Sequence, residues 1–200
     1  MKPRRTEHPI IFSRDMVRAI LAGRKTVTRR VLVPQPVATA LATCPYGVPG
    51  DTLYVRENWR VRADQDETPN AGLDPSRDSP WYDADDDSQP SGCAGGAGRL
   101  RQSIFMPRWA SRIVLPVIDV SVQRLHDITD TDARLEGMPP PGPVQGKLNG
   151  DPATLYLIDP RDAYSRLWDA INAKRGYSWI SNPWVWRIEF SAPVMSGGLA

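Results

Sequence analysis

The junction between a short helix and a strand at residues 20–30 limits the fold of this chain more than any other stretch. Its sequence is Ile-Leu-Ala-Gly-Arg-Lys-Thr-Val-Thr-Arg-Arg. Gly23 predicts the end of the helix, because glycine readily adopts the left-handed backbone that follows a helix. From residue 26 onward, strand alternation separates the side chains into two faces. One face carries Thr26, Thr28 and Arg30, and the other carries Val27, Arg29 and Val31. The side chains of the first face are too polar for a hydrophobic core, so we expect this face to line a polar cavity with Lys25 at its mouth.

Composition narrows the class of protein. The chain has 200 residues, 40% hydrophobic content and seven Trp, which favours a single folded domain carrying an insertion. A net charge of +2 does not by itself indicate a protein that coats nucleic acid. No apolar run has the length of a membrane span, and no secretory signal follows the N-terminus. Cys44 and Cys93 do not form a disulfide framework or a metal-ligand set, so we expect reduced thiols in the cytoplasm.

The pattern of apolar residues predicts a small mixed fold of the α+β class. Strands are expected at 9–12, 26–33, 53–56, 112–125 and 184–190, and helices at 14–22, 130–136 and 160–175. The regular alternation of strand and helix that marks a doubly wound parallel sheet is missing. A curved, barrel-like sheet with two or three helices at its ends fits better. The tail from Ser191 on is expected to be loose.

Residues 62–102 differ from the rest of the chain. They are rich in Asp, Ser, Gly and Pro, and no periodicity persists through them. We therefore expect a long, irregular and flexible insertion, docked on the body through Trp81 and Tyr82. Its run Asp85-Asp86-Asp87 is interpreted as a solvated acidic loop, with metal binding as the alternative.

Three residues outside the junction are candidates for a site. Glu57 and Trp59 end the strand at 53–56, where they serve either as a site rim or as a salt-bridged carboxylate and a core indole. Glu136 falls in the last turn of a short helix, where the helix dipole disfavours a negative charge. It is either a functional group or an exposed surface residue.

The junction resembles the signature of the ASCH domain family, which has a PUA-like β-barrel fold and a motif written G-x-K-x-x-E-x-R. Gly23, Lys25 and Arg30 match, but Thr28 stands where the motif has Glu. In this respect the chain is similar to the subset that contains the small bacterial N4-acetylcytidine amidohydrolases, which are proposed to use a Thr, a Lys and a Glu. The segment 125–138 resembles the stretch that carries their catalytic Glu, which falls on Glu136. The Pro-Gly-Asp-Thr-Leu-Tyr-Val run at 49–55 and the Trp-rich last strand also resemble phage-associated ASCH proteins.

The resemblance implies an amide hydrolase that acts on a small nucleoside or nucleobase without a metal or other cofactor. Thr28 is then the nucleophile, Lys25 the base that activates it, and Glu136 the group that orients Lys25 and returns the proton. Arg30 shares the face of Thr28 and holds an oxyanion or a carbonyl. The remaining candidates for substrate binding are Arg24, Thr26, Glu57 and Trp59.

Three other interpretations remain open. Without the resemblance, Lys25 and Glu136 form a plain ion pair while Thr28 satisfies a backbone group. The basic N-terminal thirty residues also suit an RNA-binding or RNA-cleaving module, although the acidic insertion would repel a long polyanion. A third possibility is a domain that binds a modified nucleobase without turning it over. The sequence does not indicate an oligomeric state.

Overall fold

The computed structural model describes residues 5–35, 44–85, 96–139, 143–145, 155–157 and 159–195. Within these ranges the chain is a mixed α and β structure that divides into two compact units. Unit 1 comprises Met1–Gly23, Pro45–Ile118 and Ser191–Ala200, and unit 2 comprises Arg24–Cys44 and Asp119–Phe190. Cys93, Asp86 and Asp87, which the sequence singled out, lie outside the described residues.

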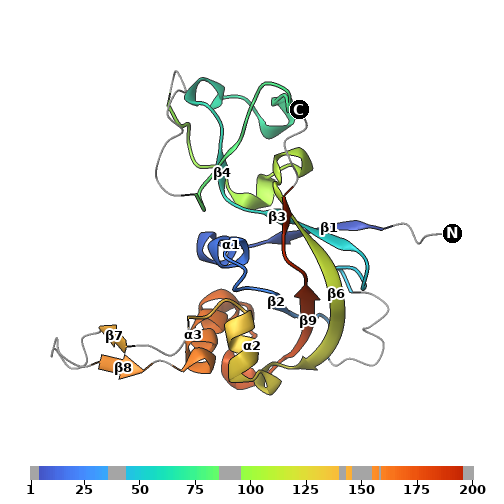
Figure 1. Cartoon of the computed structure of the whole chain (residues 1–200), viewed down its shortest axis with the longest axis vertical. Coiled ribbons are helices and arrows are strands. Elements are labelled where there is room, and N and C mark those ends of the chain that lie inside the picture. Colours follow the sequence, from blue (N-terminus) through green and yellow to red (C-terminus); the bar gives the residue numbers. More distant parts are fainter. Residues whose placement is uncertain are drawn as a thin grey trace. The chain divides into compact units, whose positions relative to one another are not determined.

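Unit 1 is built on strands that meet in the order β1-β3-β6 (Figure 1). Strand β1 (Glu7–Ile11) pairs parallel to β3 (Thr52–Arg56), which pairs antiparallel to the first part of the long strand β6 (Ile113–Arg124). The C-terminal strand β10 (Val194–Met195) pairs antiparallel with β6, so this part of the tail is not loose as expected. Helix α1 (Arg14–Leu21) buries Val17, Ala19 and Ile20 and ends before Gly23, whose φ is +70°.

The described part of the insertion belongs to unit 1 and consists mainly of turns and short 3-10 helices. A short ladder pairs β4 (Trp59–Arg60), just before the insertion, with β5 (Trp81–Tyr82) inside it. Arg101 ties it together by donating to the carbonyl oxygens of Gln65 (2.7 Å) and Thr68 (3.1 Å) and to the Asn70 side chain. A hydrophobic cluster lies beneath these loops and contains Trp59, Val61, Leu73, Met106 and Ala110, with Tyr82 and Trp109 packed against it.

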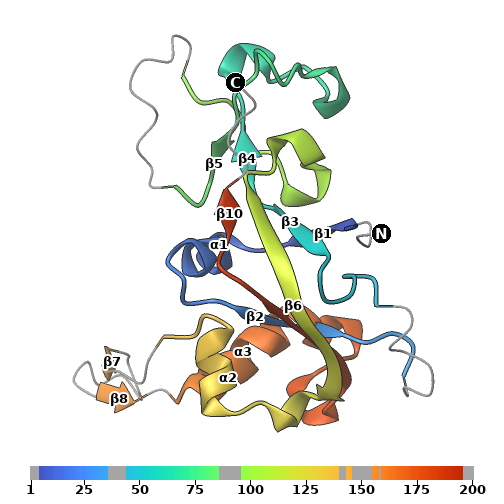
Figure 2. The same ribbon diagram turned by 45° about the vertical axis from the view of Figure 1, so that its right-hand side comes forward.

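Unit 2 contains the strand order β6-β9-β2 and two helices that pack side by side (Figure 2). Strand β2 (Val27–Val31) runs antiparallel to β9 (Trp184–Phe190). Helix α2 covers Asp130–Leu135, and α3 covers Pro160–Asn172. A short ladder joins β7 (Pro143–Gln145) to β8 (Leu155–Leu157).

Capping residues define both helices of unit 2. The Thr129 hydroxyl accepts from the Asp132 amide at 3.1 Å, and the Asp132 carboxylate accepts from the Thr129 amide, which forms a capping box. Asp159 caps α3 and accepts from the Arg161 amide at 2.7 Å, with Pro160 as the first helical residue. Both helices bury side chains in one core cluster. It comprises Leu125, Ile128, Ala133, Tyr164, Trp168 and Val185, with Val31, Met138 and Trp179 packed against it.

The expected class is confirmed at the level of a mixed fold with a mostly antiparallel sheet and a few helices. Each expected strand and helix is present, and boundaries differ by a few residues at the ends. In the part of the chain that the structure describes, no helix is long and apolar enough to cross a membrane.

Candidate functional site

The backbone after Gly23 brings Lys25 against Glu136, a residue far away in the sequence. Lys25 and Glu136 form an isolated antiparallel bridge just before β2 begins. The amide of Thr26 donates to the carbonyl oxygen of Leu135 at 2.9 Å, which extends this contact by one residue. The C-terminal end of α2 therefore pairs with the residues just before β2, and the side chains of Lys25 and Glu136 lie next to each other.

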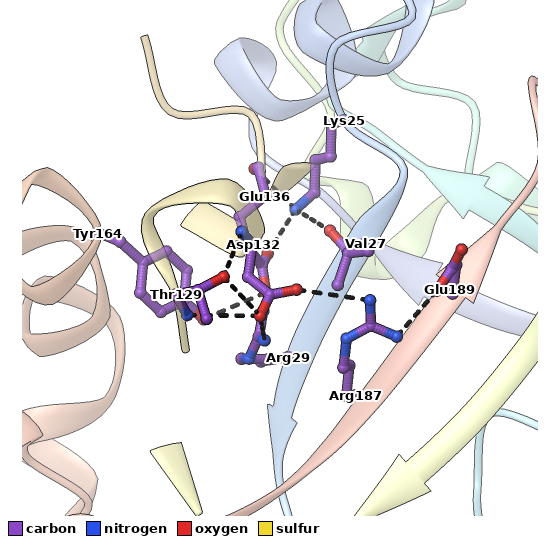
Figure 3. A network of polar contacts seen from close by, with 9 residues as sticks. All are labelled: Lys25, Val27, Arg29, Thr129, Asp132, Glu136, Tyr164, Arg187 and Glu189. Atoms are coloured by element: carbon purple, nitrogen blue, oxygen red, sulfur yellow. Dashed lines mark hydrogen bonds and ion pairs between the residues drawn. The ribbon is translucent and has the colours of Figure 1, made fainter. Parts of the chain in front are cut away.

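The ammonium group of Lys25 is fully buried and meets three acceptors (Figure 3). Nζ donates to Glu136 Oε2 at 2.7 Å, to the Glu136 carbonyl oxygen at 2.9 Å and to the Val27 carbonyl oxygen at 2.8 Å. Three acceptors match the three N–H groups of an ammonium. Burial is the main cause that lowers the pKa of Lys25; Glu136 opposes this shift, while Arg30 and Arg29 add to it. Lys25 is thus a buried amine whose charge depends on one carboxylate.

Glu136 lies at the C-terminal end of α2 and is 3% exposed. The helix dipole disfavours a carboxylate at this end, so the charge needs compensation from elsewhere. Its second oxygen, Oε1, accepts from Arg29 Nη1 at 3.2 Å and from the Tyr164 hydroxyl at 3.4 Å. Burial, and next the Glu136 charge, raise the pKa of Tyr164 well above its usual value. Tyr164 therefore remains a neutral donor toward Glu136 across the physiological pH range.

Arg29 connects Glu136 to the rest of unit 2. Its Nη2 lies 3.2 Å from Asp132 Oδ2, one helical turn before Glu136. With the Gln123 amide oriented so that its oxygen faces the guanidinium, this oxygen accepts from Nε at 2.8 Å and from Nη2 at 2.9 Å. Burial alone would raise the pKa of Asp132, but Arg29, Thr129 and Arg187 hold it below its usual value. The contacts of Arg29 thus come from α2 and from β6.

Thr28 lies on the other face of β2 from Arg29, as strand alternation requires. It is 3% exposed and pairs with Ile188 on β9. Lys25 Nζ reaches the carbonyl of the Val27–Thr28 peptide, which places the amine beside the backbone of Thr28. Among the residues that the structure describes, the Thr28 hydroxyl has no hydrogen-bond partner. The next residue on its face, Arg30, lies opposite the buried Trp186 in the strand register.

Arg24 and Thr26 flank Lys25 in different ways. Arg24 is exposed, and its Nη1 lies 3.4 Å from the carbonyl oxygen of Gly137, directly after Glu136. Thr26 is half-buried and links three segments through its backbone, because its carbonyl oxygen accepts from the Phe190 amide at 2.9 Å. The structure thus gathers Lys25, Glu136, Arg24 and Thr26 at one end of β2.

Glu57 and Trp59 belong to unit 1 and have their own partners there. Arg112 binds both Glu57 oxygens, from Nε at 3.0 Å and from Nη2 at 3.2 Å, and it also pairs with Asp85. Burial raises the pKa of Glu57, although Arg112 works against this. Trp59 is fully buried in the cluster beneath the insertion. For these two residues the structure shows the salt-bridged carboxylate and the core indole that the sequence offered as alternatives.

The sequence predicts Arg24, Arg29 and Arg30 as neighbours that lower the pKa of Lys25, and the structure gives that effect to Arg30 and Arg29. It does not predict the contact of Arg29 with Glu136; the signal for an inward Arg29 is a charged residue between two Val positions on the apolar face of a strand. Tyr164 is predicted only as part of a helix stripe, and the sequence gives no signal for Asp132 or Gln123. In the described ranges, no group of three or more His, Cys, Asp or Glu side chains is arranged to hold a metal ion.

Comparisons with known proteins give no relative for this chain. No protein-family model matches it, and neither the curated proteins nor the solved structures contain a significant match.

Proposed function

We propose that this protein is an amidohydrolase that removes an acyl group from the exocyclic amine of N4-acylated cytidine or cytosine. The observation that carries the proposal is the buried contact of 2.7 Å between Lys25 Nζ and Glu136 Oε2, which joins residues 111 positions apart. These two residues are the pair that the resemblance to the amidohydrolase subset implies. The finer fold assignment, a small curved PUA-like barrel, belongs to the same proposal and rests on the same resemblance.

The reaction begins when the Thr28 oxygen attacks the acyl carbon and its proton passes to neutral Lys25. The bond between the acyl carbon and N4 then breaks, and N4 leaves as the free amine with the proton that Lys25 received. Water attacks the acyl ester on Thr28, which releases a carboxylic acid and restores the hydroxyl. Arg30, on the face of Thr28, stabilises the oxyanion that forms in both steps.

Lys25 needs a neutral amine for this role, and burial favours one by lowering its pKa. The short contact with Glu136 opposes this shift, but it gives the proton a path away from the amine. Nζ already contacts three acceptors, so to take the proton of Thr28 it exchanges its bond to the Val27 carbonyl for one to the Thr28 hydroxyl. Glu136 holds the amine through this exchange, since it contacts Nζ with both its carbonyl and its carboxylate.

A turnover assay with isosteric variants tests the proposal. N4-acetylcytidine is incubated with the native protein and with Lys25→Met, Thr28→Val and Glu136→Gln, and release of cytidine and acetate is followed by chromatography. We expect turnover by the native protein, a loss of at least about a hundredfold in each variant, and no change in Lys174→Met. Lys174 is the matched control because it is an exposed lysine of the same unit.

The outcomes separate the three readings of the site. Absence of turnover by the native protein, together with salt-sensitive binding of RNA, would contradict the hydrolase and favour an RNA-binding module. Binding of N4-acetylcytidine without turnover would favour a protein that only recognises the modified base. Turnover that survives Thr28→Val but not Lys25→Met would keep the activity and remove Thr28 as the nucleophile. Circular dichroism of each variant checks that a loss of turnover is not a loss of fold.

A further inference from the structure

Arg29 is a charged side chain that is wholly removed from water, and the groups around it supply acceptors for its guanidinium. Its side chain has no exposed area, and Glu136, Asp132 and Gln123 receive hydrogen bonds or ion pairs from its guanidinium. Removing a guanidinium from water costs several kcal/mol unless such partners compensate for the lost hydration. A residue that served only to fill this face of β2 would be apolar, like its neighbours Val27 and Val31.

The contacts divide the Glu136 carboxylate between two cations (Figure 3). Oε1 accepts from Arg29 Nη1 and from the Tyr164 hydroxyl, whereas Oε2 accepts from Lys25 Nζ. A carboxylate held at one oxygen by a fixed donor has a fixed plane, so the direction of the other oxygen is fixed as well. Glu136 is the C-cap of a six-residue helix, and the additional link from Arg29 to Asp132 steadies this short element.

We propose that Arg29 is a positioning residue: it holds Glu136 by Oε1 so that Oε2 faces Lys25, and it takes up part of the negative charge that would otherwise keep the proton on Lys25. The inference deepens the proposed function, on which it rests for the role of Lys25 as a base. Its effect on the protonation of Lys25 can be measured whether or not the protein hydrolyses an amide.

The direction of the effect follows from the charges around Lys25. Glu136, at the end of α2, stabilises the ammonium, whereas Arg29 and Arg30 on β2 destabilise it. Further away in the network are Asp132 on α2, Tyr164 on α3, and Arg187 and Glu189 on β9. Loss of the Arg29 charge removes one repulsion on the Lys25 ammonium. The negative charge of Glu136 then acts on Lys25 alone among these two cations, so Lys25 should hold its proton to higher pH.

Lysine NMR measures this directly, because the chain has only four lysines: Lys2, Lys25, Lys147 and Lys174. The protein is labelled with ¹³C-lysine, the Lys25 signal is assigned with Lys25→Arg, and its ¹³Cε shift is followed against pH. We expect Arg29→Met to move the Lys25 midpoint up by roughly one pH unit. Arg29→Lys, which keeps the charge but loses the planar fork, should leave the midpoint close to the native one. Arg166→Met, an exposed arginine on α3, is the matched control and should change nothing.

Turnover provides the second measurement. Because a neutral Lys25 is required, the acid limb of the profile of kcat/KM against pH should move up with the midpoint in Arg29→Met. In Arg29→Lys the limb should stay in place while kcat falls about tenfold, since the carboxylate is no longer held. If Arg29→Met does not fold, Gln123→Met is the substitute test. It keeps the charge of Arg29 but removes one acceptor of its guanidinium, and it should lower kcat in the same way.

The results distinguish failure of this inference from failure of the proposed function. An unchanged Lys25 midpoint in Arg29→Met, or unchanged kcat in both Arg29→Lys and Gln123→Met, would overturn the role of Arg29. A raised midpoint in Arg29→Met in a protein that does not turn over N4-acetylcytidine would support the effect of Arg29 on Lys25 and reject the hydrolase.

Discussion

At the scale of single residues, the site is governed by how buried charges are compensated. Lys25, Arg29 and Glu136 are each at most 4% exposed, yet each is matched by partners within 3.2 Å. Such groups contribute little net stability, because the cost of dehydration offsets their attraction. Their value lies in geometry, since a group that cannot turn to water keeps its direction, and for Lys25 also in a pKa that burial lowers.

Tyr82 gives a residue-scale prediction at high pH. Burial raises the pKa of Tyr82 to about 12, and its hydroxyl donates to the Ala110 carbonyl oxygen at 2.9 Å. The folded state therefore keeps the phenol proton at pH values where the unfolded state, with a pKa near 10, has lost it. We expect stability to fall as pH rises from about 10 to 12, and to fall less in Tyr82→Phe. Ultraviolet titration at the phenolate band should show one fewer late-titrating tyrosine in the variant. An equal number in both proteins would contradict the assignment.

At the scale of elements, the six-residue helix α2 depends on its cap. So short a helix is unstable by itself. The Thr129 capping box and the ion pair between Asp132 and Arg29 support its first turn, and the contacts of Glu136 with Lys25 and Arg29 support its C-terminal end. Thr129→Ala should lower the free energy of unfolding by about 1 kcal/mol and speed amide exchange at Ala133, which donates to Thr129. Denaturant titration and hydrogen exchange measure these two effects. Thr131→Ala, an exposed change inside the same helix, is the control and should be neutral or slightly stabilising.

At the scale of the whole molecule, each compact unit has a hydrophobic cluster of its own. Met106→Ala in the unit 1 cluster and Leu125→Ala in the unit 2 core should each lower the free energy of unfolding by roughly 2–5 kcal/mol. Each substitution should also speed amide exchange in the strands of the unit that carries it. Denaturant titration and hydrogen exchange measure these effects, and an unchanged free energy of unfolding would contradict the core position of the residue.

Much of the local structure follows from the sequence because it depends on neighbouring residues alone. Gly23 has the positive φ expected at the end of α1, and Thr129 and Asp159 cap their helices. The strand expected at 184–190 is present with the same bounds. These features need no distant partner, since caps, turns and alternation are decided within a few residues.

The sequence by itself determined the class of fold, most of its elements and Lys25 and Glu136 as candidates, the latter from a resemblance and from its poor place in a helix. Only the tertiary structure decided which groups meet. It paired Lys25 with Glu136, placed Glu57 and Trp59 with partners in unit 1, and turned Arg29 inward onto Glu136. The physical reason is that a buried charge is tolerated only where another segment supplies its counter-charge. Strand alternation predicts the face on which Arg29 lies. The carboxylates that it contacts there, Asp132 and Glu136, belong to a helix about a hundred residues later in the sequence.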